Sequence, residues 1–393
     1  MNLIEFIFRV FTPFNTFFII VATYFITIYF YLRWLTKKYL NPVDRTHDLN
    51  LSRRYLRTNN QVRQELEDRE TINILVLTGG GVRGMIPLQV LEKLEQLSAR
   101  KTGELFDFMA GTSTGAISCA ILAVPGIDHQ FEFCSSDILG DYAGNSRKMF
   151  SAPWYHKFLT LFGMLGPRYL PEGKLEVLRS FFGTCTLADI ETNLIVPVYD
   201  VTENALKIIR NWELPQGNHH TNYVLKDLIH GASNPPMLFS PRSFIISNKK
   251  HVFIDPGVIL NNPATIAFMN AWFLFPEKKL RLVLIGNGGS DAEVYNHEHM
   301  AEFGAYGLFQ YLLNSPVVNT KFSTDLLHEY IHEAREYGVD IEFIQIDSRG
   351  GKDLATSDTS DENMERIREF GEKLITENYD KIEYLAEVLK IKK

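Results

Sequence analysis

Short apolar runs alternate with longer stretches of helical periodicity over most of this chain. The run INILVLT (72–78) ends at glycines, which is typical of a buried strand, and after it leucines recur every three residues from Leu88 to Leu97, as on one face of a helix. Further strands are predicted at NLIVPVYDV (193–201), SFIIS (243–247), HVFID (251–255), LRLVLIGNG (280–288) and IEFIQID (341–347). Strands that alternate with helices predict an α/β fold, with a central, mostly parallel sheet flanked by helices.

The N-terminal segment 1–40 has a different pattern. Residues 14–32, FNTFFIIVATYFITIYFYL, carry no charge, and as a helix they rise about 28 Å, close to the hydrocarbon thickness of a bilayer. We therefore predict a single transmembrane anchor at 14–32, with a buried core helix or a signal peptide as alternatives. Only Arg9 precedes this span, whereas seven basic residues follow it: Arg33, Lys37, Lys38, Arg45, Arg53, Arg54 and Arg57. The positive-inside tendency then places the bulk of the protein on the cytoplasmic side.

The remaining chain divides by pattern into three parts. Residues 41–70 are predicted to form a polar linker, 71–290 a catalytic core, and 291–393 a helical extension that packs on this core. Apolar residues at helical spacing from Glu362 to Lys390 predict an amphipathic helix in the extension.

Composition limits the classes of function. The chain has 393 residues, of which 45% are hydrophobic and 22% charged, as in an ordinary globular protein. A formal net charge of −7 argues against a nucleic-acid partner, because no basic excess exists to neutralise phosphates. The three cysteines form no C-x-x-C pair, which fits a reducing compartment.

A glycine-rich turn, GGGVRG (79–84), follows the first predicted core strand and precedes a helix. Its glycines have the G-x-G-x-x-G spacing of a dinucleotide-binding loop, for which Glu104 or Asp107 is the candidate ribose ligand. The same backbone amides can instead hold the oxyanion of a reacting ester. The residues of this candidate oxyanion hole are Gly79, Gly80, Gly81, Val82, Arg83 and Gly84.

A second turn, GTSTG (111–115), matches the G-x-S-x-G nucleophile elbow between an apolar run and a helix. Such a turn exposes the Ser113 hydroxyl, and its flanking residues are Gly111, Thr112, Thr114 and Gly115. A dinucleotide site leaves this serine without a role, whereas a serine hydrolase uses both turns. The pair of turns therefore favours a hydrolase.

A nucleophilic serine needs a base, and Asp255 in FIDPG is the candidate. An aspartate of ordinary pKa, about 3.9, is a weak base, but it can accept the proton if it lies within hydrogen-bond reach of Ser113. The alternative is a turn-forming Asp-Pro-Gly. A histidine base is a further alternative, with His297, His299, His328 and His332 after Asp255 and His251 just before it.

LTGGGVRG, GTSTGA and FIDPGVILNNPA, in this order, resemble the three blocks of patatin-like phospholipases. HGASNPPMLFSP (230–241), LRSFFGTCTLADI (178–190) and LVLIGNG (282–288) also resemble segments of that family. The resemblance implies a three-layer fold and a Ser-Asp dyad, with Ser113 as nucleophile and Asp255 as base. It also implies an oxyanion hole at Gly79 to Gly84, braced by Arg83. The implied substrates are acyl esters of phospholipids or related glycerolipids at a membrane, without a metal or organic cofactor.

Two residues depart from the family pattern. Pro256 stands where the family usually has glycine, before Gly257, and Ala116 stands where a second glycine is usual. Proline offers no N–H and restricts the preceding residue to extended conformations. A catalytically disabled, membrane-bound lipid-binding or scaffold protein is therefore an alternative function.

Two other segments have competing interpretations. His328-Glu329-x-x-His332 matches the H-E-x-x-H of zinc metallopeptidases, although a polar face of a surface helix also explains it. The segment 152–170, APWYHKFLTLFGMLGPRYL, is rich in aromatics and leucines. It is typical of a lid or of a surface that dips into a membrane interface, and equally of a core-facing helix and loop.

Overall fold

The computed structural model describes residues 3–39, 55–127, 130–213, 222–246, 249–288, 322–348, 350–351 and 354–390. Residues 40–54 of the predicted anchor and linker segments, and residues 289–321 with His297 and His299, lie outside this range. The strands are β1 Arg57–Thr58, β2 Thr71–Leu77, β3 Phe108–Gly111, β4 Asn193–Asp200, β5 Ala205–Arg210, β6 Trp212–Glu213, β7 Arg242–Ile246, β8 Lys249–Ile254, β9 Lys279–Ile285 and β10 Ile341–Ile346.

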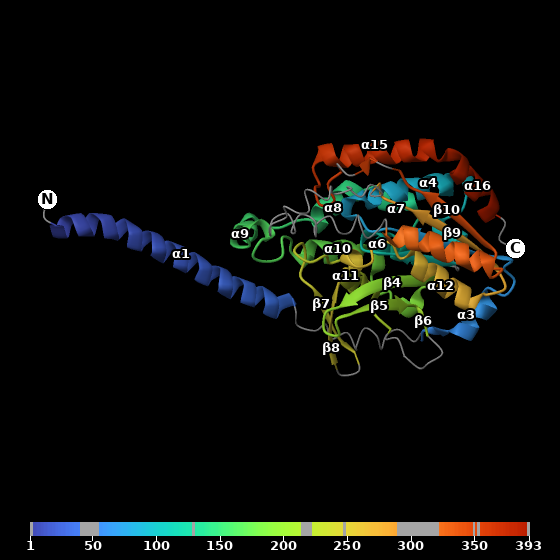
Figure 1. Cartoon of the computed structure of the whole chain (residues 1–393), viewed down its shortest axis with the longest axis horizontal. Helices are drawn as coiled ribbons and strands as arrows, with labels where there is room; N and C mark the ends of the chain where they lie inside the picture. The colour runs from blue at the N-terminus through green and yellow to red at the C-terminus, as the bar shows by residue number, and fades with distance from the viewer. Residues whose placement is uncertain are drawn as a thin grey trace.

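β1 and β6 form a small sheet of their own, and helices cover both faces of the central sheet that the other strands form (Figure 1). The helices of the described residues are α1 Leu3–Tyr39, α3 Asn59–Glu65, α4 Met85–Ser98, α5 Thr102–Leu105, α6 Thr114–Leu122, α7 Ser135–Leu139, α8 Tyr142–Met149, α9 Trp154–Leu159, α10 Pro171–Phe182, α11 Leu225–Ala232, α12 Ala264–Leu274, α15 Asp361–Glu377 and α16 Tyr379–Lys390. A further helix covers 322–336. Short 3-10 helices are η1 Gly81–Gly84, η3 Leu161–Gly163, η4 Leu187–Asp189 and η5 Pro256–Val258.

The central sheet is mostly parallel, as the sequence predicted. Its order is β10-β9-β2-β3-β4-β8-β7, and β5 also pairs with β4. The pairs from β10 to β4 are parallel, whereas β5, β8 and β7 add antiparallel pairs at the other end. β10 lies beyond the matched family blocks, so the C-terminal extension contributes a strand to the sheet as well as helices.

Alternate residues of the central strands feed two separate cores. In β2, Leu75 and Leu77 pack with α4 and α6 on one face, while Ile74 and Val76 pack with α12 and helix 322–336 on the other. Successive side chains of a strand point to opposite faces, so a strand that is apolar at every position requires cover on both. The chain is therefore a three-layer α/β/α fold.

The predicted C-terminal helix is two helices. α15 ends and α16 begins on either side of Asn378, whose backbone angles, φ −120° and ψ 20°, leave the helical region. The Asn378 side chain donates to the Leu374 carbonyl at 3.1 Å and so caps the end of α15. Since apolar residues continue at helical spacing on both sides, periodicity alone did not reveal this break.

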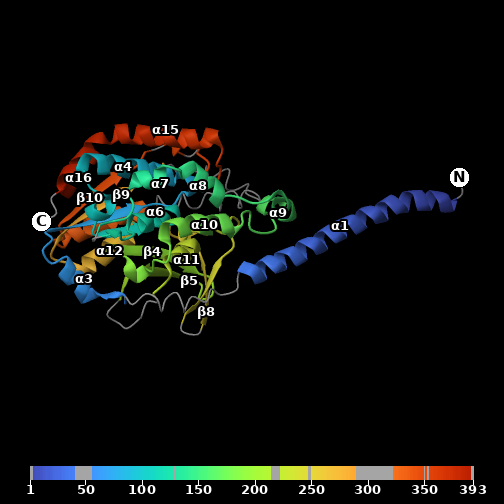
Figure 2. The same cartoon turned by 180° about the vertical axis from the view of Figure 1, so that it is seen from behind.

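Helix α1 extends away from the body of the molecule, and α9 lies on the side of the body next to it (Figures 1 and 2). Among the described residues, α1 contains the one segment, Ile19–Tyr39, that is long and apolar enough to cross a membrane. Only 11% of that segment is buried in the protein, which distinguishes it from a core helix.

Candidate active site

The two glycine turns meet because β2 and β3 are parallel neighbours. Leu77, the last residue of β2, pairs with Gly111, the last residue of β3. The carboxyl ends of parallel strands lie at one edge of the sheet, where ligand sites of α/β folds form. The loop 79–84 and Ser113 therefore lie side by side, and a Cβ added to Gly79 would meet the Ser113 Cβ at 3.1 Å.

Ser113 sits in a strained turn between β3 and α6. Its φ of 55° and ψ of −120° are rare for a residue with a side chain. The flanking glycines make the bend possible, because a Cβ on Gly111 would meet the Gly115 carbonyl carbon at 2.2 Å, and one on Gly115 the Leu77 carbonyl oxygen at 2.4 Å. This strand-turn-helix geometry is that of a nucleophile elbow. Ala116, which stands where the family usually has a second glycine, is fully buried in the core and does not line the cavity beside Ser113.

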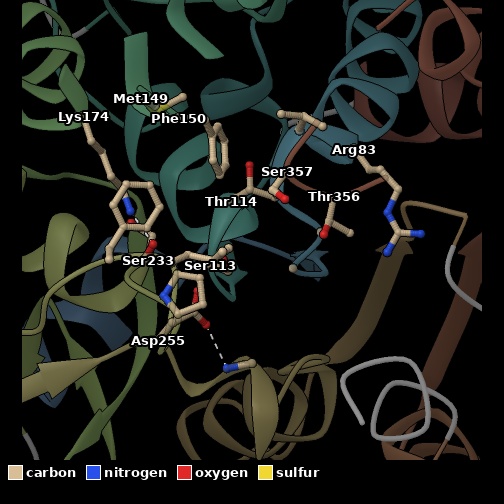
Figure 3. A pocket seen from close by; sticks show the side chains of 18 of the residues that line it. Arg83, Ser113, Thr114, Met149, Phe150, Lys174, Ser233, Asp255, Thr356 and Ser357 are labelled. Carbon is tan, nitrogen blue, oxygen red and sulfur yellow. Dashed lines mark hydrogen bonds between the residues drawn. The ribbon is translucent and has the colours of Figure 1, made fainter. Parts of the chain in front are cut away.

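Asp255 directly follows β8, and its side chain lies beside Ser113 in the candidate site (Figure 3). Its amide donates to the Asn234 carbonyl at 3.1 Å, and its Oδ1 accepts from the Gly257 amide at 2.8 Å. Pro256 fits this turn because Asp255 is extended, with φ −58° and ψ 125°, and proline is the first residue of η5. Because the first N–H groups of a helix have no partner within the helix, η5 loses no hydrogen bond by beginning with Pro256.

The Asp255 carboxyl is in an environment that strengthens it as a base. Its side chain is only 4% exposed, and this burial raises its pKa above the usual value. The neighbouring Ser113 hydroxyl, the hydrogen bond from the Gly257 amide and the positive charge of Lys174 lower the pKa without cancelling the effect. Ser113 thus lies in the same cavity as a carboxylate of raised proton affinity.

Lys174 is a buried cation that the sequence analysis missed. It projects from α10 and is 2% exposed. Its Nζ donates to the Ser233 carbonyl and to Asn234 Oδ1 at 2.9 Å, and lies 4.5 Å from the centre of the Phe239 ring. Burial lowers the pKa of Lys174 to about 7, while Asp255 acts to raise it. The sequence does contain a sign that Lys174 is buried, because its helical spacing places it on the same apolar face of α10 as Val177 and Leu178.

Some amides of the glycine loop already donate hydrogen bonds to main-chain carbonyls of other segments. The Gly79 amide donates to the Asn261 carbonyl at 3.3 Å, and the Val82 amide to the Thr356 carbonyl at 2.9 Å. Within the described part of the chain, the amides of Gly80, Gly81 and Thr114 have no such acceptor. These three N–H groups therefore have no main-chain acceptor among the described residues, and they lie close to Ser113.

Side chains that are distant in sequence hold this loop in place. Asn261 Nδ2 donates to the Gly79 carbonyl at 3.2 Å, and Asn287 Nδ2 donates to the same oxygen. The Arg83 guanidinium points away from Ser113 (Figure 3) and donates to the Gly351 carbonyl at 3.1 Å. Burial lowers the pKa of Arg83, partly offset by Asp347 nearby. Arg83 therefore braces the loop against the C-terminal segment.

Ser113 and Asp255 open into a cavity of about 810 Å³, large enough for a sizeable organic ligand. Much of its wall is apolar, with contributions from Ile117, Met149, Phe150, Met164, Leu238 and Phe239. Neither candidate ribose ligand lines it: Asp107 accepts from the Asn73 amide at 2.8 Å, and Glu104 pairs with Arg100 at 3.2 Å. The dinucleotide interpretation of the loop is thus left without its acidic residue.

No histidine of the described ranges lines the cavity. His251 is buried against Asp200, with 2.6 Å between Nδ1 and Oδ2. His328 and His332 are exposed on helix 322–336. The described residues do bring the potential metal ligands Asp200, Glu203 and His251 together. Lys207 Nζ already occupies that position, 3.0 Å from Asp200 and 2.7 Å from Glu203.

Comparison with known proteins gives the same family as the three motifs. Residues 75–268 match the family model described as patatin-like phospholipase, a range that contains the glycine loop, Ser113 and Asp255. Patatin-like protein 2 of Oryza sativa subsp. indica is 25% identical over 81% of this chain and 87% of its own length. Patatin-like protein 4 of Arabidopsis thaliana is 25% identical over 78% and 84%. Patatin-04/09 of Solanum tuberosum is 23% identical over 78% and 84%. Residues 75–268 of this chain are therefore a domain of the patatin-like phospholipase family.

Proposed function

We propose that this protein is a serine lipid acyl hydrolase that cleaves fatty-acyl esters of phospholipids or related glycerolipids. The observation that carries the proposal is the meeting of Ser113, Asp255 and the glycine loop in the wall of one largely apolar cavity. Patatin-like domains belong to lipid acyl hydrolases, and the apolar wall suits an acyl chain. Both steps of such a reaction can be assigned to these groups.

In the first step, the Ser113 Oγ attacks the ester carbonyl while Asp255 takes the hydroxyl proton. The carbonyl oxygen becomes an oxyanion, which the amides of Gly80, Gly81 and Thr114 stabilise, helped by the N-terminal dipole of α6. When the tetrahedral intermediate collapses, the ester C–O bond breaks and Asp255 returns the proton to the departing alcohol. This leaves an acyl group on Ser113 and a lysolipid or alcohol as the first product.

In the second step, water attacks the acyl-enzyme. Asp255 takes one proton from this water, and a second oxyanion forms in the same place. The bond between the acyl carbon and Ser113 Oγ then breaks. Asp255 then returns its proton to Ser113 Oγ, and a free fatty acid leaves. The raised pKa of Asp255 favours these transfers, because a base is most effective when its pKa approaches the working pH.

We also propose that α1 anchors the protein in a membrane, with the catalytic domain on the cytoplasmic side. The length and exposure of Ile19–Tyr39 and the excess of basic residues after it support this arrangement. An anchor raises the local concentration of lipid around the cavity.

The test of the hydrolase is fatty-acid release by the full chain from vesicles of mixed phospholipid and neutral glycerolipid, with a metal chelator present. We expect free fatty acid and lysolipid from the native protein, and a loss of at least about 1,000-fold in Ser113→Ala and Asp255→Asn. Ser180→Ala is the matched control, because Ser180 only bonds the Val177 carbonyl of its own helix, at 2.8 Å.

Each other outcome points to a different function. A native protein that is folded but releases no lipid product in this assay contradicts the hydrolase and favours the lipid-binding or scaffold alternative. A mild loss in Asp255→Asn, beside a full loss in Ser113→Ala, assigns the base to another residue. Activity that appears only when zinc replaces the chelator directs attention to His328 and His332.

A further inference from the structure

An exposed apolar hairpin lies beside α1, formed by α9, η3 and the following residues up to Pro167. Trp154, Phe158 and Met164 are 79%, 55% and 81% exposed, and Tyr155 and Leu165 are also exposed. Over the segment 152–167, Lys157 is the only Lys, Arg, Asp or Glu. A contiguous exposed surface of this kind is unusual on a soluble protein and marks an interaction site.

The hairpin is joined to α1 by specific contacts. The Tyr24 hydroxyl donates to the Phe158 carbonyl at 2.8 Å, and the two rings lie 5.2 Å apart. The Tyr31 hydroxyl and His156 Nδ1 are 2.6 Å apart, although His156 itself is fully buried. Both cartoon views place α9 at the end of the body that faces α1 (Figures 1 and 2). The surface is therefore continuous with the candidate membrane span.

Several buried and main-chain polar groups of the hairpin bond within the protein. His156 Nε2 bonds the Pro167 carbonyl at 2.7 Å, and Thr160 Oγ1 donates to the His156 carbonyl at 2.8 Å. The Gly163 and Leu165 amides both donate to the Thr160 carbonyl, each at 3.0 Å. Of the described buried side-chain atoms without a partner, none belongs to 152–167. Irregular backbone is tolerated at membrane depth only when its polar groups are satisfied in this way.

The contacts with α1 set the depth of the hairpin. Trp34 and Tyr31 stack 5.9 Å apart near the end of the apolar segment, where aromatic residues mark the membrane interface. Tyr24 lies ten residues before Trp34, a rise of about 15 Å along a helix. That rise is half of a hydrocarbon core of about 30 Å. Lys38 pairs with Glu172 of α10 at 2.6 Å beyond the interface, on the side of the catalytic domain. The hairpin thus falls within the leaflet nearest to that domain.

The same hairpin forms part of the wall of the catalytic cavity. Gly163 and Met164 line it, as does Arg168 directly after the hairpin, and Met237 in the same wall is 46% exposed. The Arg168 amide donates to the Met237 carbonyl at 2.8 Å, which ties the hairpin to the loop that follows α11. The exposed apolar surface and the cavity therefore share Met164.

We propose that α9 and η3 insert into one leaflet of the membrane beside α1, so that the catalytic cavity opens among the acyl chains. A glycerolipid then enters laterally, with its acyl chain passing Met164, and does not cross water. Lys157, the one Lys or Arg of 152–167, extends toward the headgroups as long basic side chains do. This inference rests on the proposed membrane anchoring by α1, and it adds the entry route and the surface that makes it.

The depth of Trp154 tests the insertion without any need for activity. The full chain is placed in phospholipid nanodiscs that contain either ordinary or mid-chain brominated phosphatidylcholine, and its tryptophan emission is compared with that of Trp154→Phe. We expect the emission that Trp154 contributes to be quenched severalfold by bromolipid and little by aqueous acrylamide. Trp272→Phe is the control, since Trp272 packs on Phe268 of α12, away from the hairpin. Quenching of Trp154 by acrylamide alone would overturn the proposal, and would leave the surface to a protein partner.

A second measurement links insertion to turnover. The double variant Trp154→Asp/Phe158→Asp is compared with Phe273→Asp/Tyr337→Asp, which replaces two aromatics elsewhere on the molecule that are 69% and 85% exposed. We expect the ratio of bilayer-lipid to water-soluble-ester hydrolysis to fall at least tenfold in the first variant and not in the second. Equal ratios in both contradict lateral entry. A native protein inactive on both substrates contradicts the hydrolase itself, which the quenching measurement distinguishes from failed insertion.

Discussion

Lys174 and Asp255 place opposite charges in the same buried pocket, and the charge of Lys174 opposes the rise in the pKa of Asp255. Asp255 must be ionised to accept the Ser113 proton, so activity falls as pH drops through the pKa of Asp255. Removing the ammonium of Lys174 removes an interaction that favours the carboxylate. The pKa of Asp255 should then rise further, and the acid limb of the rate profile should move to higher pH.

We therefore predict that Lys174→Met shifts the acid limb of kcat/KM for a soluble ester upward by about one pH unit. Lys174→Arg keeps a positive charge and should recover part of the shift. The measurement is kcat/KM against pH for the three proteins. A lower rate at every pH with an unmoved limb would show that Lys174 only supports the fold, through Ser233 and Asn234.

The variant Gly81→Ala tests the contribution of one backbone N–H group to the proposed oxyanion hole. Its φ is +59°, and an added Cβ would lie 2.0 Å from the Thr356 carbonyl oxygen, so Gly81→Ala must displace the loop. We expect kcat to fall about 100-fold, since removal of one oxyanion donor typically costs this much. Gly338→Ala is the matched control, because Gly338 also has a positive φ, +83°, but has open space around it. Similar kcat values for the two variants would contradict this role of the loop.

At the scale of single residues, the sequence predicted those residues of the candidate site that lie in short motifs. Ser113, Asp255 and the glycines could be predicted because a tight turn fixes which residue types it accepts. Asn261, Asn287 and Thr356 could not, because they reach the loop from segments far away in the chain. The free amides of Gly80 and Gly81 likewise depend on which neighbouring amides such distant carbonyls occupy.

At the scale of elements, α15 and α16 are part of the core that carries the site. Both pack on α4, the helix that follows the glycine loop, and Ile367, Leu374 and Leu385 are buried there. The segment between β10 and α15 also supplies the Thr356 and Gly351 carbonyls that hold Val82 and Arg83. The C-terminal extension therefore positions the loop as well as covering the sheet.

We predict that Leu374→Ala lowers the free energy of unfolding by about 3 kcal/mol, the usual cost of emptying a fully buried leucine site. Lys373→Ala, next to it and largely exposed, should change this free energy by no more than about 0.5 kcal/mol. Denaturant unfolding of both variants in detergent solution makes the comparison. If the two are equally stable, α15 is not packed on α4 as described.

Elements were predictable from sequence where their periodicity was strong. β2, β4 and β9 are apolar along most of their length, because they are buried on both faces. β5 was missed because it pairs with β4 alone among the described strands, and its sequence, ALKIIR, mixes basic and apolar residues that are mostly half-buried. The break at Asn378 was missed because a cap of one residue leaves the helical spacing on both sides unchanged.

At the scale of the whole molecule, the N-terminal helix and the catalytic domain meet at the hairpin 152–167. Sequence predicted the apolar helix from its length and lack of charge, and it left 152–170 open between a membrane surface and a core helix. The exposure of Trp154 argues against a core helix, and the contacts of Tyr24 and Tyr31, more than 120 residues away, support the membrane surface that we propose. The order of three short motifs was enough to predict the family, whereas the membrane arrangement that we propose could be argued only from the fold.

The central claim is that Ser113 is a nucleophile activated by Asp255, and covalent labelling tests it most directly. The full chain is incubated with a fluorophosphonate, which forms a phosphonyl ester on an activated serine as fluoride leaves, and the labelled residue is identified by mass spectrometry. We predict labelling at Ser113, slowed at least about 100-fold in Asp255→Asn and unchanged in Asp380→Asn on the surface helix α16. Labelling of another serine, or labelling of Ser113 at the native rate in Asp255→Asn, would contradict the account.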